Sequence, residues 1–207
     1  MTSDKPPPSP PRQPALTPDR LSPEQRRLYG EITGGQRSGG AFALTDAAGV
    51  LQGPFGGFLL SPALGDKVQQ LGAAVRYDSR LSARIRELAI LAVAGYHQSP
   101  FERDAHVAVG RTIGLSEAEM GAAYSGEHKP FDDVAETAAL RMTRAILNGD
   151  VDDQTWHGCV PPLSVEDVFE LLVLVGYYSM LAVQMRVLRV EEPSAVTDPA
   201  NPASRPQ

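Results

Sequence analysis

The stretch RIRELAILAVAGYHQSPFERDAH, residues 84–106, decides the fold and holds the most informative side chains of the chain. Glu87 is its only acidic residue before Glu102, and the residues three and four positions after Glu87, Ile90 and Leu91, are apolar. Positions three and four apart share one face of an α-helix. A carboxylate on such a face points either into the core or into a cleft.

A second helix is predicted after a break near His97. Within it, Glu102 and His106 are four residues apart and therefore lie on the same side of the helix. This spacing predicts an acid and a base within reach of each other. Ser99 is either the N-cap of this helix or a hydrogen-bond donor in a pocket, and His97 is close to the same site.

Composition indicates one cytoplasmic domain that acts on small molecules or proteins. The chain has 207 residues, of which 42% are hydrophobic, enough for one core. Its net charge of -6 argues against a nucleic-acid or anionic-membrane surface. Its single cysteine, Cys159, excludes an internal disulfide and a two-cysteine redox pair. The first twenty residues are proline-rich and polar, and we expect no signal peptide there.

Apolar residues at helical spacing predict an all-α fold, and no alternating strand pattern is present. Pairs such as Ser116 with Glu119 and Ser164 with Asp167 are typical of helix starts. The proline-rich ends, residues 1–20 and 191–207, are predicted to be disordered tails around a domain of residues 21–190. Helices are expected over residues 22–32, 61–77, 82–97, 100–114, 116–124, 131–147, 152–159 and 164–190.

Three further segments have an unusual composition. The most apolar run, residues 171–185, is shorter than the roughly 20 residues of a membrane span, so we expect a core helix. The segment GPFGGFLLSP, residues 53–62, is either an apolar loop against a pocket, with Phe55 in its wall, or a plain hydrophobic plug. The glycine-rich GGQRSGG, residues 34–40, lacks the Lys-Ser/Thr pair of a phosphate-binding loop.

The order Arg-x-Arg-Glu-Leu-Ala-Ile-Leu from Arg84, then Glu102-x-x-x-His106 and a Gly-Leu-Ser turn from Gly114, resembles the carboxymuconolactone decarboxylase family. The resemblance covers roughly residues 21–190 and implies the AhpD-like helical fold of that family. It also implies a homo-oligomer: a dimer, a trimer or a hexamer. Further matching positions are Gly53 to Phe55, Ser61 with Pro62, and Gly176 to Tyr178.

The peroxidase branch of this family places two cysteines between a glutamate and a histidine. Here the flanking residues are Glu87 and His106, but the two cysteine positions hold Ser99 and Glu102. Peroxide reduction through this motif needs an attacking thiolate and a resolving thiol. The resemblance therefore implies a member that is not a thiol peroxidase.

The remaining glutamate and histidine pair is suited to proton transfer. We expect a lyase of the decarboxylase kind, or an isomerase, that needs no cofactor and acts on a small carboxylated or enolisable substrate. His106 would be the general acid or base because the ordinary pKa of histidine is about 6.5. Glu102 would orient His106 or share a proton with it. Burial and a second carboxylate would raise the pKa of Glu87.

Arg84 or Arg86 would bind a substrate anion, although Arg86 is equally suited to a structural pair with Glu87. No histidine pair has a metal-binding spacing, so no metal is expected. Three alternatives remain: a buried structural ion pair, a satisfied core histidine at His106, and a helical scaffold or small-ligand-binding protein without catalysis. The predicted substrate-binding residues are Arg84, Arg86, Ser99, Phe55, His97 and Tyr178.

Overall fold

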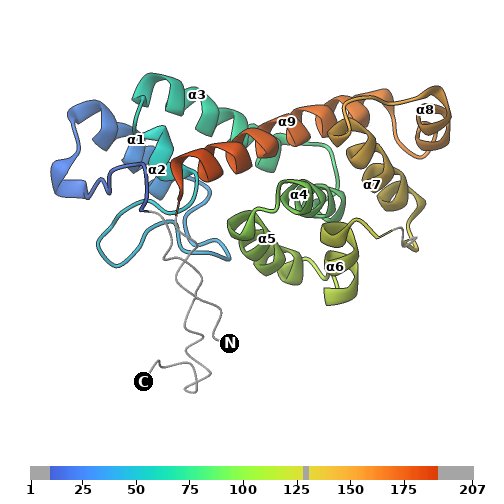
Figure 1. Cartoon of the computed structure of the whole chain (residues 1–207), viewed down its shortest axis with the longest axis horizontal. Coiled ribbons are helices and arrows are strands. Elements are labelled where there is room, and N and C mark those ends of the chain that lie inside the picture. Colours follow the sequence, from blue (N-terminus) through green and yellow to red (C-terminus); the bar gives the residue numbers. More distant parts are fainter. Residues whose placement is uncertain (1–9, 128–130, 191–207) are drawn as a thin grey trace, which may run out of the picture.

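The computed structural model describes residues 10–127 and 131–190, which form an all-α fold around one central helix, α4 (Figure 1). Helix α4 packs against α5, α6, α7 and α9. Helices α1 to α3 lie beside one another near the C-terminal end of α9. Within the described residues the only β-pairing is one isolated bridge between Thr45 and Leu51. The helices are α1 (Pro23–Gly34), α2 (Phe55–Phe58), α3 (Pro62–Ala73), α4 (Ala83–His97), α5 (Pro100–Thr112), α6 (Glu117–Ser125), α7 (Val134–Leu147), α8 (Asp153–Cys159) and α9 (Val165–Leu188).

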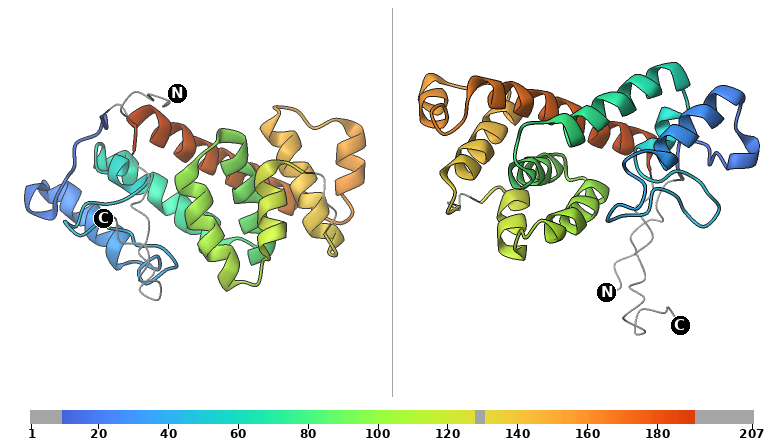
Figure 2. Two further views of the ribbon diagram at one scale, coloured as in Figure 1. Left: turned by 60° about the horizontal axis from the view of Figure 1, so that its bottom comes forward. Right: turned by 180° about the vertical axis from the view of Figure 1, so that it is seen from behind.

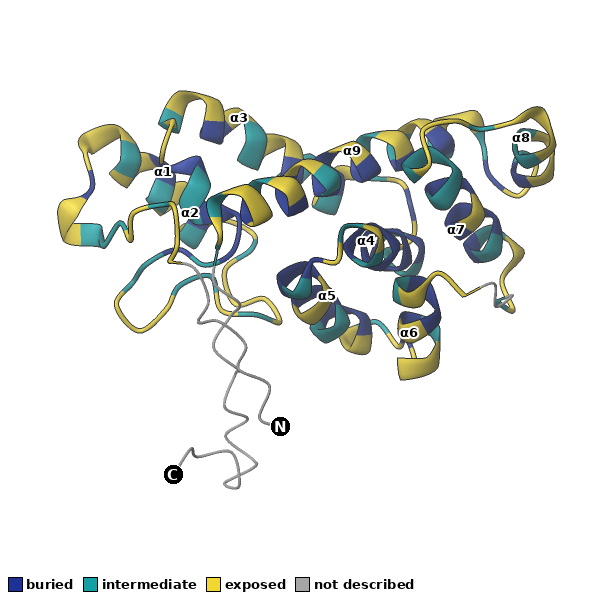
Figure 3. Cartoon of the chain, viewed as in Figure 1, coloured by how far each residue is buried: buried dark blue, intermediate teal, exposed yellow. Residues whose placement is uncertain are grey.

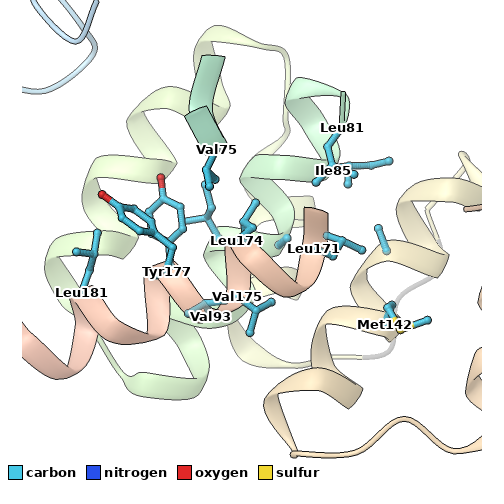
Figure 4. Close-up of a cluster of buried hydrophobic side chains, with 14 of the residues drawn as sticks. Val75, Leu81, Ile85, Val93, Met142, Leu171, Leu174, Val175, Tyr177 and Leu181 are labelled. Atoms are coloured by element: carbon cyan, nitrogen blue, oxygen red, sulfur yellow. The ribbon is translucent and has the colours of Figure 1, made fainter. Parts of the chain in front are cut away.

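Helix α4 is central because it is apolar on both sides. Its Ile90 and Val93 belong to the main core, which includes Leu171 and Leu174 of α9 (Figure 4). Its Leu88 and Leu91 pack on the opposite side in a second cluster with Met120 of α6 and Leu140 of α7. A helix that is apolar all round is stable only when neighbours cover it. The single acid within this buried surface, Glu87, is therefore held inside the protein.

Helix starts follow the predicted capping residues. Ser22, Ser116 and Ser164 each form a capping box with the residue three positions later. Ser61 differs, since its side chain makes no capping hydrogen bond. Helix α7 begins at Val134, later than predicted, because the side chain of Asp133 caps it by accepting from the backbone of Ala135.

The end of α3 and the segment before it also differ from the prediction. The helix expected over residues 61–77 ends as α3 at Ala73 and continues as one π-helical turn, Ala74–Asp78. Within residues 53–62, predicted as a loop, Phe55–Phe58 form the short helix α2. The rings of Phe55 and Phe58 pack edge to face at 5.8 Å, which buries both. The local sequence does not predict α2, because its stability comes from tertiary packing.

Residues 10–20, which we predicted as part of a disordered tail, are packed against the domain. The backbone N–H of Arg12 donates to the carbonyl of Leu188 at 2.9 Å, and Leu16 contacts the main core. A single 3-10 turn, Pro18–Arg20, then leads into α1. The rest of the predicted tails, residues 1–9 and 191–207, lies outside the described residues.

Helix α9 is longer than the apolar run suggested, and it runs along one side of the molecule (Figure 2). By length and composition it is long and apolar enough to cross a membrane, with a mean hydropathy of 1.6 over its most apolar window. Half of that window, 50%, is buried against the rest of the chain. One face of α9 is thus a core face, as predicted, and exposed residues alternate with buried ones along the helix (Figure 3).

Candidate active site

The structure brings Glu87, Glu102 and His106 together. Glu87 comes from α4, whereas Glu102 and His106 come from successive turns of α5. His106 Nδ1 lies 2.6 Å from Glu87 Oε2, and His106 Nε2 lies 3.3 Å from Glu102 Oε2. All three side chains are buried. The imidazole therefore lies between two carboxylates, one on each ring nitrogen.

The charges of this group differ from the sequence-based expectation. Burial by itself lowers the pKa of His106, but the carboxylates of Glu87 and Glu102 outweigh it and raise this pKa to about 9. Burial by itself raises the pKa of Glu87, but His106, Arg76 and Arg86 outweigh it and hold this pKa below its usual value. The predicted rise in the pKa of Glu87 is therefore wrong in direction, because its neighbour is an imidazolium rather than a neutral imidazole.

One side-chain oxygen of Glu102 has no hydrogen-bond partner among the described residues. Its Oε2 faces His106, while its Oε1 is buried and has no hydrogen-bond partner among the described residues. Leaving such an atom unpaired inside a protein is costly. Glu102 also lines a cavity, together with His106.

The cavity lies where α5, α9, the short helix α2 and the glycine-rich segment meet. Its volume open to the centres of water molecules is about 60 Å³, which corresponds to about four waters or one small organic molecule. Six of the lining residues are Phe or Tyr, and the ring of Tyr178 packs edge to face on His106 at 5.1 Å. The principal lining residues are Arg37, Phe42, Phe55, Arg76, Phe101, Glu102, His106, Tyr177, Tyr178 and Leu181.

Two arginines that the sequence analysis missed line this cavity. Arg76 Nη1 lies 3.6 Å from Glu87 Oε1, so Arg76 takes the pairing role that we expected of Arg86. Arg37 is held by Gln69, to whose Oε1 its Nη1 donates at 3.0 Å, and its guanidinium lies over the ring of Phe55 at 5.6 Å. Among the described residues Arg37 makes no ion pair with a carboxylate.

Nothing in the sequence around Arg37 or Arg76 indicated that either residue lines a cavity. Arg37 lies within the glycine-rich segment, and Arg76 lies in the π-helical turn after α3. Both lie outside the stretch of residues 84–106, and the packing of the glycine-rich segment and of the turn after α3 beside α5 and α9 places them at the cavity.

The predicted arginines are elsewhere. Arg84 does not line the cavity: its Nε donates to Glu136 at 2.6 Å, and its guanidinium also pairs with Glu119. It connects α4 with α6 and α7 as a structural ion pair. Arg86 donates to the carbonyl of Leu81 at 3.4 Å and does not line the cavity either.

Of the other predicted substrate-binding residues, Phe55 and Tyr178 line the cavity. Ser99 and His97 do not. Ser99 is buried directly before α5, and its side chain makes no capping hydrogen bond. His97 ends α4 and packs against the ring of Tyr96 at 5.1 Å. Both lie where α4 ends and α5 begins, and neither belongs to the lining of the cavity.

Thiol and metal groups are not gathered at this site. The one cysteine, Cys159, is buried at the end of α8, where burial raises the pKa of its thiol. In residues 10–127 and 131–190, no group of three or more His, Cys, Asp and Glu side chains is arranged to hold a metal ion.

Comparison with solved structures shows the fold. A protein of unknown function from Agrobacterium tumefaciens, provisionally described as an antioxidant defence protein AhpD, is 22% identical with a TM-score of 0.60, over 66% of this chain and 94% of that one. An uncharacterised peroxidase-related protein from Ralstonia eutropha JMP134, with an alkylhydroperoxidase AhpD core, is 14% identical with a TM-score of 0.70, over 89% and 93%.

A cysteine-to-alanine variant of the debrominase Bmp8, in complex with 2,3,4-tribromopyrrole, is 12% identical with a TM-score of 0.68, over 88% of this chain and 91% of that one. At these identities the likeness establishes the predicted AhpD-like all-α fold. No curated protein matches the sequence.

Residues 62–145 match the carboxymuconolactone decarboxylase family, whose name is that of an enzyme. This range contains α3 to α6 and most of α7, and therefore all three members of the buried acid–histidine group. Residues 62–145 of the chain are thus similar to the carboxymuconolactone decarboxylase family, and the two positions of the peroxidase cysteines hold Ser99 and Glu102.

Proposed function

We propose that the protein is a lyase of the decarboxylase kind, or an isomerase, that transfers a proton to or from a small carboxylated or enolisable substrate without a cofactor. The observation that carries this proposal is the buried group of Glu87, His106 and Glu102. One oxygen of Glu102 has no hydrogen-bond partner among the described residues, and Glu102 and His106 line the cavity. The family of residues 62–145 supports an enzymatic role.

In this proposal Glu102 is the residue that contacts the substrate. His106 is engaged on both ring nitrogens, so its role is to hold a proton between the carboxylates of Glu87 and Glu102. In an isomerase, the Glu102 carboxylate removes a proton next to a substrate carbonyl, leaves an enolate, and returns the proton to a different atom of that enolate. In a decarboxylase, His106 Nε2 first passes its proton to the Glu102 carboxylate. Carbon dioxide leaves, its bonding electrons form the enolate, and the enolate carbon takes that proton from Glu102. A proton from water then restores the imidazolium of His106.

The charges of the site favour an anionic substrate. Arg37, Arg76 and the imidazolium of His106 carry three positive charges, and Glu87 and Glu102 carry two negative ones. The excess positive charge lies beside a partly buried cavity, where electrostatic interactions are stronger than in water. Arg37, which has no acidic partner among the described residues, is the residue best suited to bind a substrate carboxylate.

The size and walls of the cavity favour a compact, flat substrate. About 60 Å³ of space for water centres leaves room for one small molecule between aromatic rings. The debrominase whose solved complex holds a tribromopyrrole shows that a protein of this fold can bind a small flat ring.

The test uses small enolisable acids in deuterated water. Acetoacetate, oxaloacetate and a carboxylated butenolide are incubated with the protein, and NMR follows deuterium uptake and loss of carbon dioxide above the buffer rate. Wild-type protein should accelerate one of these reactions. Glu102→Gln should lower that rate at least about a hundredfold, the low end of what one general acid–base group contributes. The retained fold of Glu102→Gln is checked by circular dichroism.

Arg37→Gln tests the anion site separately. It should raise KM with little change in kcat, because a group that binds the substrate carboxylate holds ground state and transition state alike. Arg27→Gln, which removes an exposed arginine of α1 paired with Glu31, is the matched control and should change neither constant. Binding of all three acids without any exchange or decarboxylation would contradict the proposal and assign the chain to small-ligand binding.

A further inference from the structure

Helix α9 carries a continuous apolar stripe that the rest of the described chain leaves uncovered. The stripe spans residues 165–187, about 33 Å at 1.5 Å per residue. Its residues recur at intervals of three and four, so they lie on one narrow face of the helix. All of them are exposed, and Phe169 keeps 64% of its surface open to solvent. The stripe residues are Val165, Phe169, Leu172, Gly176, Met180, Val183 and Val187.

The stripe is symmetric about Gly176. Each residue on one side of Gly176 has an apolar counterpart at the same distance on the other side. The pairs are Leu172 with Met180, Phe169 with Val183, and Val165 with Val187. A stripe with this order matches itself when a second copy runs in the opposite direction. A twofold dimer requires such a self-complementary surface.

Gly176 lies at the middle of the stripe and faces open space. A Cβ built on Gly176 would meet nothing within 4 Å, so no contact inside the described chain requires a glycine there. A glycine inside an exposed helix is less favourable than an alanine. Small residues at a helix crossing let two backbones approach closely. A crossing at Gly176 therefore accounts for a residue that the monomer does not need.

The charges at the two ends of α9 complement each other in the same arrangement. Glu166 flanks the stripe near its start and Arg186 flanks it near its end, and both are exposed. They too are equally distant from Gly176. In an antiparallel pair the acidic end of one helix is level with the basic end of the other, and the two helix dipoles oppose each other, which is favourable. A parallel pair would place like charges side by side.

We propose that two copies of the chain pair through this stripe, with their α9 helices antiparallel and crossing at Gly176. The occupant of the exposed face is thus a second copy of the same protein. Phe169 of one copy lies against Val183 of the other, and the same contact repeats across the twofold axis. This proposal does not depend on the proposed function, because the cavity is lined by other residues of α9.

The register is tested by charge substitution in the full-length chain, with mass measured by sedimentation equilibrium at micromolar concentration. The wild type should have twice the monomer mass of 22.2 kDa, or a larger even multiple. Phe169→Glu and Val183→Lys should each reduce the mass at least to half. The double variant should restore it, because each new glutamate then lies opposite a new lysine.

Leu64→Glu is the matched control, since it places the same charge on an equally exposed apolar residue of α3 and should leave the mass unchanged. Circular dichroism of each variant shows whether the helices persist. A monomeric wild type, a mass unaffected by Phe169→Glu, or a double variant that stays dissociated would each overturn the proposal. So would a monomer that binds neutral lipid vesicles through α9, since the stripe would then face a membrane.

Discussion

The charge state of His106 makes the stability of the protein depend on pH. In the folded chain the pKa of His106 is about 9, whereas an unfolded histidine titrates near 6.5. Because the folded value is raised, its stabilisation is fully present below about pH 6.5 and is lost as the pH rises toward 9. At about 1.4 kcal/mol for each tenfold change in proton affinity, the full contribution is about 3 kcal/mol, of which about 2 kcal/mol disappears between pH 6.5 and 8.5.

This loss is measured by urea unfolding of the wild type at several pH values between 6.5 and 8.5. The range stops at pH 8.5 because above it the unfolded Cys159 thiol ionises while burial raises the pKa of the folded thiol, which adds a second pH dependence. In His106→Gln this loss of stability with rising pH should disappear. His157→Gln, which removes an exposed histidine of α8, should keep the wild-type dependence.

An NMR titration of the His106 ring nitrogens provides a measurement that does not need the variant to fold. A pKa near or below 6.5, or an unfolding free energy that stays constant from pH 6.5 to 8.5, would refute the reasoning. Either result would mean that burial of the imidazole outweighs the two carboxylates, and that His106 is neutral at physiological pH. The pKa of Glu87 is held low by the same pair, so acid below its usual value of about 4.5 should also weaken the fold.

Two further substitutions test the packing around α4. Gly95→Ala should cost about 1 to 3 kcal/mol, because the new Cβ would collide with the backbone carbonyl of Tyr124. Gly121→Ala on α6 is the control: a Cβ meets nothing there, so the substitution should not destabilise the chain. Thermal unfolding compares the two variants, and equal melting temperatures would disprove the close approach at Gly95. Arg84→Met should cost about 2 kcal/mol, because it removes the charged hydrogen-bond donor of the buried Glu136. Substrate binding should not change, and a loss of binding measured by calorimetry would show that Arg84 belongs to the site.

Much of the fold was predictable because it depends on local signals. Helix starts follow short-range hydrogen bonds, such as that of Ser116 with the backbone of Glu119, so they were located almost to the residue. Helix α4 was predicted from an apolar run that is longer than a typical strand. The short helix α2 and the packing of residues 10–20 were missed, since contacts distant in sequence hold both segments.

The acid–histidine group was predictable only in part. The spacing of Glu102 and His106 along one helix placed them together, and the family resemblance pointed to Glu87. The sign of the Glu87 pKa change was not predictable, because it depends on whether His106 is charged. That charge depends on distances between side chains from two different helices.

By itself the sequence determined the helical class, most helix boundaries, the absence of a thiol pair and the acids and histidine that meet in the interior. These follow from periodicity, capping and residue type, which act over a few positions. Only the tertiary structure decided that Arg37 and Arg76, rather than Arg84 and Arg86, line the cavity, and that one face of α9 is uncovered. The physical reason is that burial and charge pairing are set by neighbours that are close in space and distant along the chain.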